Sequence, residues 1–360
     1  MLHGELLIDF NKNFWRRTPR VFRQAIDVSA YPLEMDSLCK MTLSDMVESR
    51  MVNTNQELLL GPFDKSDFPS EFVPKDHLLL IQCLEQHLHT AALLLREQFK
   101  FIPSWQVDDV MSSIGDTGAN CGAHFDQYDV FLLQHHGKKR WHLDEGGHIE
   151  SDLDNNEEIR VLKDFNPKES FDLTAGDVLY LPPGIGHLGI CDGPSMTLSI
   201  GIRNPTQADL LADLSEFVLE DLSSNITMNN QLHSIESGLP TCIAEELSND
   251  VSHLFNIETL QRWYGCYVTR LRDSDLLRQN NEKEYKDSIN FATALPTRMT
   301  YARINQKFFF YVNGDVFELN NEDEDWVRTL CNSREFKKTD RISTEGKDCL
   351  SLLLKTGALV

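Results

Sequence analysis

The sequence lacks the features that mark several classes of protein. Its longest apolar runs, such as residues 78–81 and 91–95, are far shorter than the ~20 residues that cross a bilayer, so we expect no membrane span. Its eight cysteines include no CxxC pair and do not cluster with histidine, which argues against a zinc knuckle or a disulfide scaffold. No basic segment followed by an apolar one opens the chain, so we expect no secretory signal and a cytoplasmic protein.

Positive charge is also scarce. The 34 Lys and Arg residues against 56 Asp and Glu residues give a formal net charge of −22. Binding to phosphate backbones needs an excess of cations, so no direct nucleic-acid binding is predicted, and a basic partner fits better. The 360 residues are 41% hydrophobic, which is enough apolar material for two or three domains.

The hydrophobic pattern changes twice along the chain. Residues 76–99 have apolar residues at helical spacing without Gly or Pro, which predicts one helix. Between about 105 and 203, short apolar runs alternate with Gly, Pro, Asn and Asp clusters. This alternation of apolar runs and turn residues predicts strands of an antiparallel barrel or sandwich, in particular at 129–134, 140–143, 177–181 and 196–202.

From Pro205 the pattern is helical again, to about residue 290. The first of these helices, at 207–222, has one apolar stripe, which could cover the barrel or a second copy of the chain; it consists of Leu210, Leu211, Leu214, Phe217, Val218 and Leu222. Residues 307–319 contain two apolar runs joined by Asn313-Gly314, a strong hairpin signal. We therefore expect a small winged-helix-like domain at the end.

Two motifs in the middle of the chain carry residue types that bind metals. His124 and Asp126 form an HxD pair, and on a strand such residues point to the same face and could reach one ion. Alone, this pair is commonly part of a surface turn. His187 follows a tight Pro-Pro-Gly turn at the end of a predicted strand and could supply a third ligand, although a loop histidine is the simpler interpretation. Two histidines and one carboxylate make the facial triad of non-haem Fe(II) oxygenases.

A basic segment, residues 134–141 (QHHGKKRW), follows the HxD strand as a turn and a return strand. A cation that points into the barrel from this segment could pair with the distal carboxylate of a dicarboxylate cosubstrate, and a chelating 2-oxo acid would fill two of the open iron positions. Each element alone is weak evidence. Together, in this order and spacing, the three elements are specific.

The sequence resembles the JmjC-type 2-oxoglutarate oxygenases. It is more closely similar to the bacterial ribosomal oxygenases, the arginine hydroxylases of large-subunit ribosomal protein number sixteen. The most specific segments are 124–134 (HFDQYDVFLLQ) and 181–187 (LPPGIGH), and further matches lie at 14–19, 61–63, 105–109 and 201–205. The resemblance extends through most of the chain and implies oxidative decarboxylation of 2-oxoglutarate to succinate, with hydroxylation of an unactivated carbon by O₂.

Site residues follow from the resemblance by position. It implies that the Fe(II) ligands are His124, Asp126 and His187. Lys139 matches the basic residue that binds the 5-carboxylate of 2-oxoglutarate, where the ribosomal oxygenases have arginine and the wider class has lysine. Ser113 and Thr197 match further residues of the cosubstrate pocket. Lys138 and Arg140 flank Lys139 with the opposite pleat direction, so both should face away from the pocket.

The substrate residues are predicted from chemistry. A guanidinium substrate needs an aromatic wall and a carboxylate, and Tyr128 and Asp116 lie near the iron loop. The best interpretation is β-hydroxylation of an arginine in a basic ribosomal protein. Histidine or asparagine hydroxylation by the same centre, and a non-catalytic cupin and winged-helix binding module, are the alternatives, and succinate formation would separate the enzymes from the module.

The fold class expected is α+β. A double-stranded β-helix (cupin, JmjC jelly roll) flanked by helices occupies residues 1–203 and contains the catalytic site. A helical dimerisation segment follows at 204–290, and a winged-helix-like domain occupies 291–360. We expect a homodimer built on the helices that follow Pro205.

Overall fold

The computed structural model describes residues 1–68, 77–154, 159–221, 254–271, 289–339 and 341–360, with positions 245, 248, 249, 251, 252 and 277. The chain forms two compact units, Met1–Asn204 and Pro205–Val360. Their boundary lies one residue from the end of the predicted catalytic domain. The further division at residue 290 stays a prediction.

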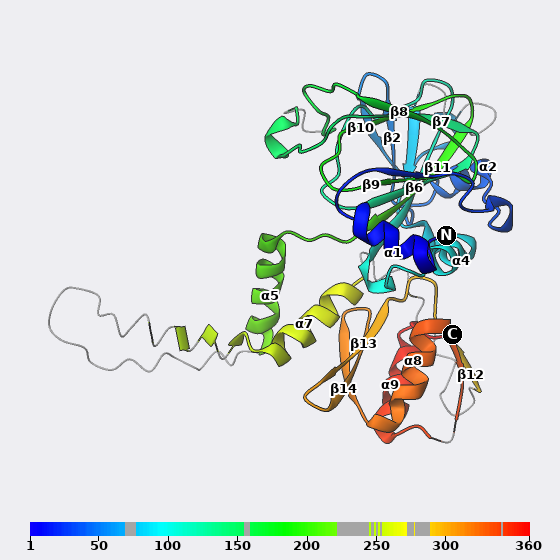
Figure 1. Ribbon diagram of the computed structural model, residues 1–360. Coiled ribbons are helices and arrows are strands. Elements are labelled where there is room, and N and C mark those ends of the chain that lie inside the picture. The colour runs from blue at the N-terminus through cyan, green and yellow to red at the C-terminus, as the bar shows by residue number, and fades with distance from the viewer. Residues whose placement is uncertain are drawn as a thin grey trace, which may run out of the picture. The chain divides into compact units, whose positions relative to one another are not determined.

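The first unit is built on two antiparallel sheets (Figure 1). The larger sheet has eight strands, in the spatial order β1 (Arg20–Phe22), β9 (Val178–Leu181), β6 (Val130–His136), β11 (Ser195–Ile202), β5 (Val107–Gly115), β4 (His77–Ile81), β2 (Ser49–Asn53) and β3 (Leu58–Leu60). The smaller sheet has three strands, in the order β10 (His187–Cys191), β7 (Lys138–Leu143) and β8 (Glu169–Thr174).

Both faces of the larger sheet are buried, and strand β6 shows how. Val130 and Leu132 belong to a core that also contains Trp141 and Leu173 of the smaller sheet. The alternate side chains, Phe131 and Leu133, pack into a second core on the opposite face. Because side chains alternate along a strand, a strand that is covered on both faces is continuously apolar. This accounts for the unbroken apolar run that predicted the strand.

Short helices and an aromatic cluster cover the second face. The helices are α1 (Gly4–Asn13), α2 (Met35–Met41), α3 (Leu84–His87) and α4 (His89–Gln98). Phe10 of α1 is central to the cluster, and its ring centre lies 4.9 Å from that of Tyr180 and 5.8 Å from that of Phe131. Aromatic rings bury large apolar areas, so this cluster attaches the N-terminal segment firmly to the sheet.

The prediction of one helix over residues 76–99 is wrong in its first part. Residues 77–81 form strand β4, which pairs with β2 and β5, and only α3 and α4 are helical. Leu78, Leu79 and Ile81 are buried, so the apolar run reflects a strand covered on both faces. Short apolar runs fit a buried strand and a buried helix equally well. Cys83 has a positive φ of 54°, which separates the strand from the helices.

The second unit contains helices and small sheets. Within the part of this unit that the structure describes, the α-helices include α5 (Gln207–Asp221), α7 (Ile257–Thr269), α8 (Glu324–Ser333) and α9 (Thr344–Lys355). Strands β13 (Met299–Ile304), β14 (Lys307–Val312) and β15 (Asp315–Leu319) form one sheet, and β12 (Asn290–Ala292) pairs with β16 (Glu335–Lys337). Much of the helical region predicted up to residue 290 lies outside the described residues.

The predicted hairpin at 307–319 is confirmed. Strands β14 and β15 pair in antiparallel register, and the turn residues Asn313 and Gly314 have φ values of 53° and 97°. Two successive positive φ values are typical of the type I′ turn, which matches the twist of the flanking strands. The side chain of Asn313 also accepts a hydrogen bond from the backbone N–H of Arg298, which ties the turn to the start of β13.

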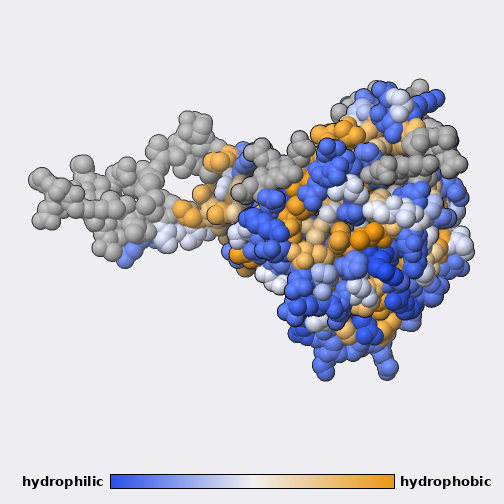
Figure 2. Space-filling model, turned by 90° about the horizontal axis from the view of Figure 1, so that it is seen from above, coloured by the Kyte–Doolittle hydropathy of each residue, from blue (hydrophilic) through white to orange (hydrophobic). Residues whose placement is uncertain are grey.

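Within the described part of the chain, no helix is long and apolar enough to span a membrane. The surface shown in Figure 2 is mostly hydrophilic, with apolar patches between the polar areas.

The buried hydroxyl of Tyr180 provides a test of how the N-terminal segment is attached. It donates to Asp129 Oδ1 over 2.5 Å and accepts from the backbone N–H of Arg16 over 2.7 Å. We expect Tyr180→Phe to lower the free energy of unfolding by about 1–3 kcal/mol, because the buried Asp129 carboxylate loses its hydroxyl donor. Urea unfolding would measure the loss.

Tyr301→Phe is the matched control, since its hydroxyl accepts from Arg328 at an exposed position. We expect it to change the free energy of unfolding by less than about 0.5 kcal/mol. An unchanged urea midpoint for Tyr180→Phe would contradict the role assigned to its hydroxyl.

Candidate metal centre and cosubstrate pocket

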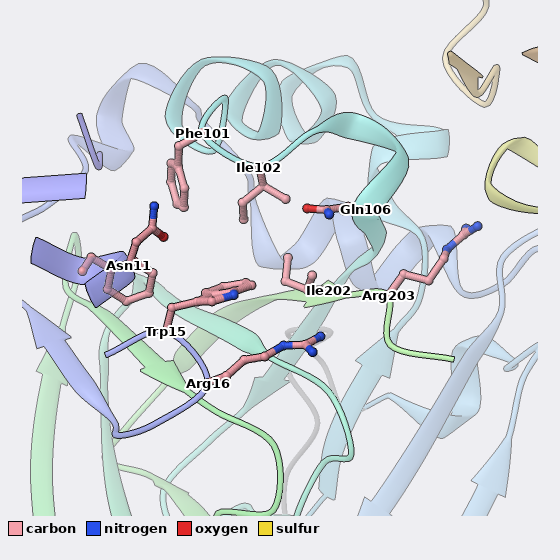
Figure 3. Close-up of a pocket in the computed structure, with 9 residues that line it drawn as sticks. Asn11, Trp15, Arg16, Phe101, Ile102, Gln106, Ile202 and Arg203 are labelled. Atoms are coloured by element: carbon pink, nitrogen blue, oxygen red, sulfur yellow. The ribbon is translucent and has the colours of Figure 1, made fainter. Parts of the chain in front are cut away.

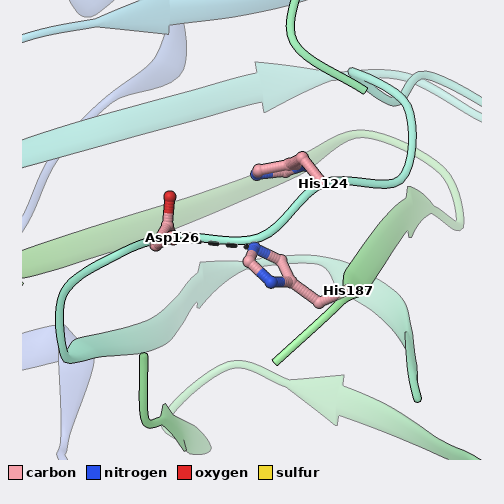
Figure 4. Close-up of side chains that lie close together, drawn as sticks. All are labelled: His124, Asp126 and His187. Carbon is pink, nitrogen blue, oxygen red and sulfur yellow. Dashed lines mark ion pairs between the residues drawn. The ribbon is translucent and has the colours of Figure 1, made fainter. Parts of the chain in front are cut away.

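The structure brings the three predicted metal ligands together (Figure 4). One ligand atom from each of His124, Asp126 and His187 lies within 4.8 Å of the others, and His187 Nε2 is 3.7 Å from Asp126 Oδ2. His124 and Asp126 belong to the loop before β6, and His187 begins β10. His124 is not part of a regular strand. It forms an isolated bridge with His187, and this bridge sets the spacing of the two histidines.

The two histidine segments are joined by reciprocal backbone hydrogen bonds. The N–H of His124 donates to the carbonyl of His187 over 3.0 Å, and the N–H of His187 donates back over 2.7 Å. The two imidazole ring centres are 4.3 Å apart. The backbone itself therefore holds the two rings side by side.

Both imidazoles are oriented as metal ligands. Nδ1 of His187 lies 2.9 Å from the carbonyl oxygen of Ile185, and Nδ1 of His124 lies 3.0 Å from that of Gly122. In a neutral imidazole, the nitrogen that faces a carbonyl carries the proton, which makes Nε2 the ligand atom for a metal. Two imidazole nitrogens and one carboxylate suit a divalent iron ion, and the residues fit this group.

The environment shifts the pKa values of the two imidazoles in opposite directions. Burial, helped by the neighbouring His124, lowers the pKa of His187 to about 4, so this ring is neutral at physiological pH. For His124, burial also favours the neutral ring, but the negative charges of the Cys121 thiolate and the Asp126 carboxylate outweigh it and raise the pKa to about 9. A metal that binds at neutral pH must therefore displace a proton from His124.

Lys139 lies in the interior next to the triad. Its side chain is 2% exposed, and Nζ lies 3.2 Å from Ser113 Oγ and 5.0 Å from the centre of the Trp141 ring. Among the described residues, no carboxylate lies within ion-pair distance of this ammonium group. A buried charge without a counter-ion is costly, so the pocket fits an anionic ligand. A Cβ at Gly189 would lie 2.8 Å from Lys139 Cε, so glycine leaves the room that this side chain needs.

Thr197 belongs to the same interior face. It is directly opposite Ser113 in the pairing of β11 with β5, and opposite Gln134 in the pairing with β6. Its hydroxyl donates to Gln134 Oε1 over 2.9 Å, and the amide of Gln134 donates to Ser195 Oγ. These buried polar groups form a wall that continues from Ser113 across three strands.

The neighbours of Lys139 face outwards, as predicted. Lys138 Nζ lies 3.4 Å from Asp172 and 3.1 Å from Asp192. Arg140 makes a bidentate pair with the same Asp172, at 2.6 and 3.0 Å. Of the three consecutive cations, only Lys139 is buried.

Of the two predicted substrate residues, Tyr128 lies beside the triad. Its ring is 41% exposed. Partial burial, and then the carboxylates of Asp126, Asp109 and Asp108, raise the pKa of its hydroxyl. A Cβ at Gly201 would lie 3.2 Å from Asp109 Oδ1 and 3.6 Å from Tyr128 Cε2. The Tyr128 ring and the Asp109 carboxylate therefore border the same space above Gly201.

Asp116, the other predicted substrate residue, follows strand β5, whereas Asp109 lies near its beginning. The carboxylate of Asp116 accepts hydrogen bonds from the backbone N–H and the hydroxyl of Thr117. Sequence reasoning missed Asp109. It lies four residues before Ser113 and thus on the same face of β5, and this spacing is the signal that could have found it.

A separate cleft of about 380 Å³ lies beside the N-terminal helix (Figure 3). Its lining includes Trp15, Arg16, Gln106 and Arg203, and none of the predicted site residues. Arg16 pairs with Asp129 and donates to Asn204, whose amide donates to the carbonyl of Gln127. Arg16 thus connects the cleft to the segment that follows Asp126.

Two family models match the chain. A JmjC domain matches residues 94–210, and a ROXA-like winged helix matches residues 252–360. The ribosomal protein uL16 3-hydroxylase of Escherichia coli is 30% identical over 276 residues, which cover 73% of this chain and 71% of that protein. The chain belongs to the JmjC ribosomal oxygenases.

Solved structures agree with this assignment at the level of the fold. The crystal structure of E. coli ycfD aligns with a TM-score of 0.83 and 22% identity, covering 98% of this chain and 97% of that one. A structure of the same ribosomal oxygenase in complex with cobalt and 2-oxoglutarate aligns with a TM-score of 0.80.

These matches confirm several predictions. The predicted fold class, a helix-flanked JmjC jelly roll with a winged-helix domain at the end, is confirmed. Members of the JmjC ribosomal oxygenase family are 2-oxoglutarate-dependent dioxygenases. The predicted enzyme class, with Fe(II), 2-oxoglutarate and O₂, is confirmed with the family.

The pKa values of the two histidines predict a pH-dependent metal affinity. Below pH 9, the apparent affinity for Co(II) should rise by up to about tenfold per pH unit, because the metal replaces one proton on His124. His187 adds nothing to this slope near neutrality, since its pKa is about 4. Calorimetric titration of metal-free protein at pH 6.5, 7.5 and 8.5 checks this, and an affinity that is constant across these values would contradict it.

The position of Lys139 predicts that its substitution lowers the affinity for 2-oxoglutarate specifically. We expect Lys139→Ala to raise the 2-oxoglutarate concentration needed for half-maximal turnover by at least about tenfold, because the distal carboxylate loses its charged partner. Lys139→Arg should be tolerated better, and Co(II) affinity should change little in either variant.

Lys138→Ala is the matched control, since this neighbouring lysine pairs with carboxylates on the outside of the sheet. Its 2-oxoglutarate requirement should equal that of the wild type. Equal cosubstrate affinity in Lys139→Ala and wild type would remove Lys139 from the pocket.

Proposed function

We propose that this enzyme hydroxylates the β carbon of an arginine side chain in large-subunit ribosomal protein number sixteen, in the cytoplasm. The observation that carries the proposal is the Tyr128 ring beside the Asp109 carboxylate, next to the metal ligand Asp126. A guanidinium binds to an aromatic face and a carboxylate together. The 30% identity to the E. coli uL16 3-hydroxylase supports the identity of the target.

The roles of the residues follow from their positions. His124, Asp126 and His187 would hold Fe(II), whose bound form supplies the oxidising power for attack on an unactivated C–H bond when 2-oxoglutarate and O₂ are present. Lys139 and Ser113 would bind the distal carboxylate of 2-oxoglutarate, with Thr197 completing the wall of the pocket. None of these side chains needs to act as a nucleophile or as a general base.

The substrate side of the site has the charge that a basic target needs. Asp108 and Asp109 lie close enough to the half-exposed Tyr128 to raise its pKa, and the chain carries a net charge of −22. Acidic groups at the entrance attract a basic polypeptide and favour its guanidinium over a neutral side chain. Asp116 stays a predicted second contact, on the loop after β5.

The choice of target residue can be tested with peptides. An arginine peptide from ribosomal protein number sixteen should gain 16 Da in a 2-oxoglutarate-dependent reaction. The corresponding lysine peptide should react at least about tenfold more slowly, because an ammonium cannot reproduce the planar fork of the guanidinium. Mass spectrometry of the products measures both rates. A histidine peptide that reacts faster than the arginine peptide would overturn the arginine assignment and leave the oxygenase in place.

Two variants of the enzyme identify the carboxylate that binds the substrate. Asp109→Asn should raise KM for the arginine peptide by about tenfold, because it removes the charge beside Tyr128. Asp116→Asn is the matched comparison, since its carboxylate already caps Thr117. A rise in KM for Asp116→Asn alone would assign the contact to the loop after β5.

We also propose that the enzyme is a homodimer formed through the helices after Pro205. The predicted stripe is only partly covered within the described chain. Leu214 and Val218 are buried against Trp263 of α7, with Leu210 and Phe217 packed beside them. Leu211, however, is 60% exposed, and Leu222 lies outside the described residues. Leu219 of α5 and Ile257 of α7 are exposed as well, so apolar area remains for a second copy.

Light scattering tests the dimer. At micromolar concentration the mass should be twice the 41.3 kDa of one chain. Leu211→Glu should shift the mass towards that of the monomer, because it puts a charge in an apolar interface. A wild-type mass of one chain would reject the dimer.

A further inference from the structure

The loop that follows β7 contacts both segments that carry the candidate metal ligands, which are the turn before His187 and the HxD segment. This loop begins at Asp144 and includes Gly146, Gly147 and His148. Its backbone pairs with the turn before His187, since the N–H of Asp144 donates to the carbonyl of Gly186 over 3.0 Å and that of His148 donates to Gly184 over 3.2 Å. Gly184 in turn donates to the carbonyl of the ligand Asp126 over 2.8 Å.

The carboxylate of Asp144 is the centre of this arrangement. Its Oδ1 accepts from the backbone N–H groups of Gly146 and Gly186, each over 2.9 Å. Its Oδ2 lies 2.6 Å from His148 Nε2, and the side chain is only 8% exposed. The Gly186 N–H belongs to the Ile185–Gly186 peptide unit, whose carbonyl oxygen lies 2.9 Å from His187 Nδ1. A side chain with no ligand role therefore holds the turn that orients this ligand.

Close packing makes the contact specific. A Cβ at Gly186 would lie 2.3 Å from Asp144 Oδ2, so only glycine allows the carboxylate to reach the backbone there. His148 extends the contact to the HxD segment, which carries His124 and Asp126. Its imidazole stacks on the ring of Phe125, with ring centres 5.8 Å apart, and Phe125 lies between the ligands His124 and Asp126.

We propose that Asp144 and His148 are positioning residues for the metal centre. Asp144 holds the turn that carries His187, and His148 connects Asp144 to the HxD segment through Phe125. Groups that hold the ligand residues in place without contacting the metal commonly contribute 10- to 100-fold to metal affinity. This inference rests on the proposed metal site and adds to it a dependence on a loop that contains no ligand.

The test measures metal binding without turnover. Metal-free full-length protein is titrated with Co(II) by calorimetry, with wild type, Asp144→Ala, Asp144→Asn and His148→Ala. We expect about a 10- to 100-fold weaker affinity for Asp144→Ala. Asp144→Asn should lose less Co(II) affinity than Asp144→Ala, because its amide oxygen still accepts from the two glycine N–H groups. His148→Ala should show a smaller loss, since Asp144 keeps both backbone contacts.

Asp177→Ala is the matched control. Asp177 is also a buried carboxylate with several donors, but these are Gln24, Thr174 and Arg23, none of which belongs to the metal loops. Its Tm should fall, and its Co(II) affinity should stay within about twofold of the wild-type value. If Asp144→Ala does not fold, Asp144→Asn and His148→Ala carry the test.

The outcomes separate this inference from the metal site. Wild-type affinity in Asp144→Ala, or in both of the milder variants, would overturn the positioning role. Equal losses in Asp144→Ala and Asp177→Ala would also overturn it, because general destabilisation would then explain both. A wild-type protein that does not bind Co(II) would instead overturn the triad itself.

Discussion

The reciprocal backbone hydrogen bonds between His124 and His187 are the constraint on which the site depends. His187 begins a strand of the smaller sheet, and His124 lies in the loop that leads into the larger sheet. Without these two bonds, nothing in the regular pairing of strands would fix the distance between the histidines. Because backbone groups make the contact, it depends little on the side chains and leaves both imidazoles to the metal.

The two buried faces of the larger sheet support this arrangement. One face packs on the smaller sheet and holds the interior in which Lys139 and Ser113 meet. The other face is covered by helices and by the aromatic cluster around Phe10. The strands that carry the proposed cosubstrate residues are therefore anchored on both sides. This rigidity suits a site whose groups must stay in place as charged ligands enter and leave.

The three candidate ligands that the structure brings together, and the buried cation beside them, could be predicted from the sequence because their motifs are local. An HxD pair, a proline-glycine turn before a histidine and alternation around Lys139 can be read within a few residues. Sequence reasoning failed at residues 77–81, where a strand buried on both faces has the same apolar run as a helix. It also missed Asp109 and Asp144. Their roles depend on which segments the fold brings next to Gly201 and Gly186, and no local pattern contains that information.

The buried ammonium of Lys139 has a consequence for the end of each catalytic cycle. Oxidation of 2-oxoglutarate to succinate would leave unchanged the distal carboxylate, which is the group that Lys139 and Ser113 would bind in the proposed site. Release of succinate from this position would leave the buried Lys139 side chain without a carboxylate partner among the described residues. In the proposed site, exchange of one dicarboxylate for another would therefore be favoured over an empty pocket, and departure of the product would be coupled to arrival of the next cosubstrate.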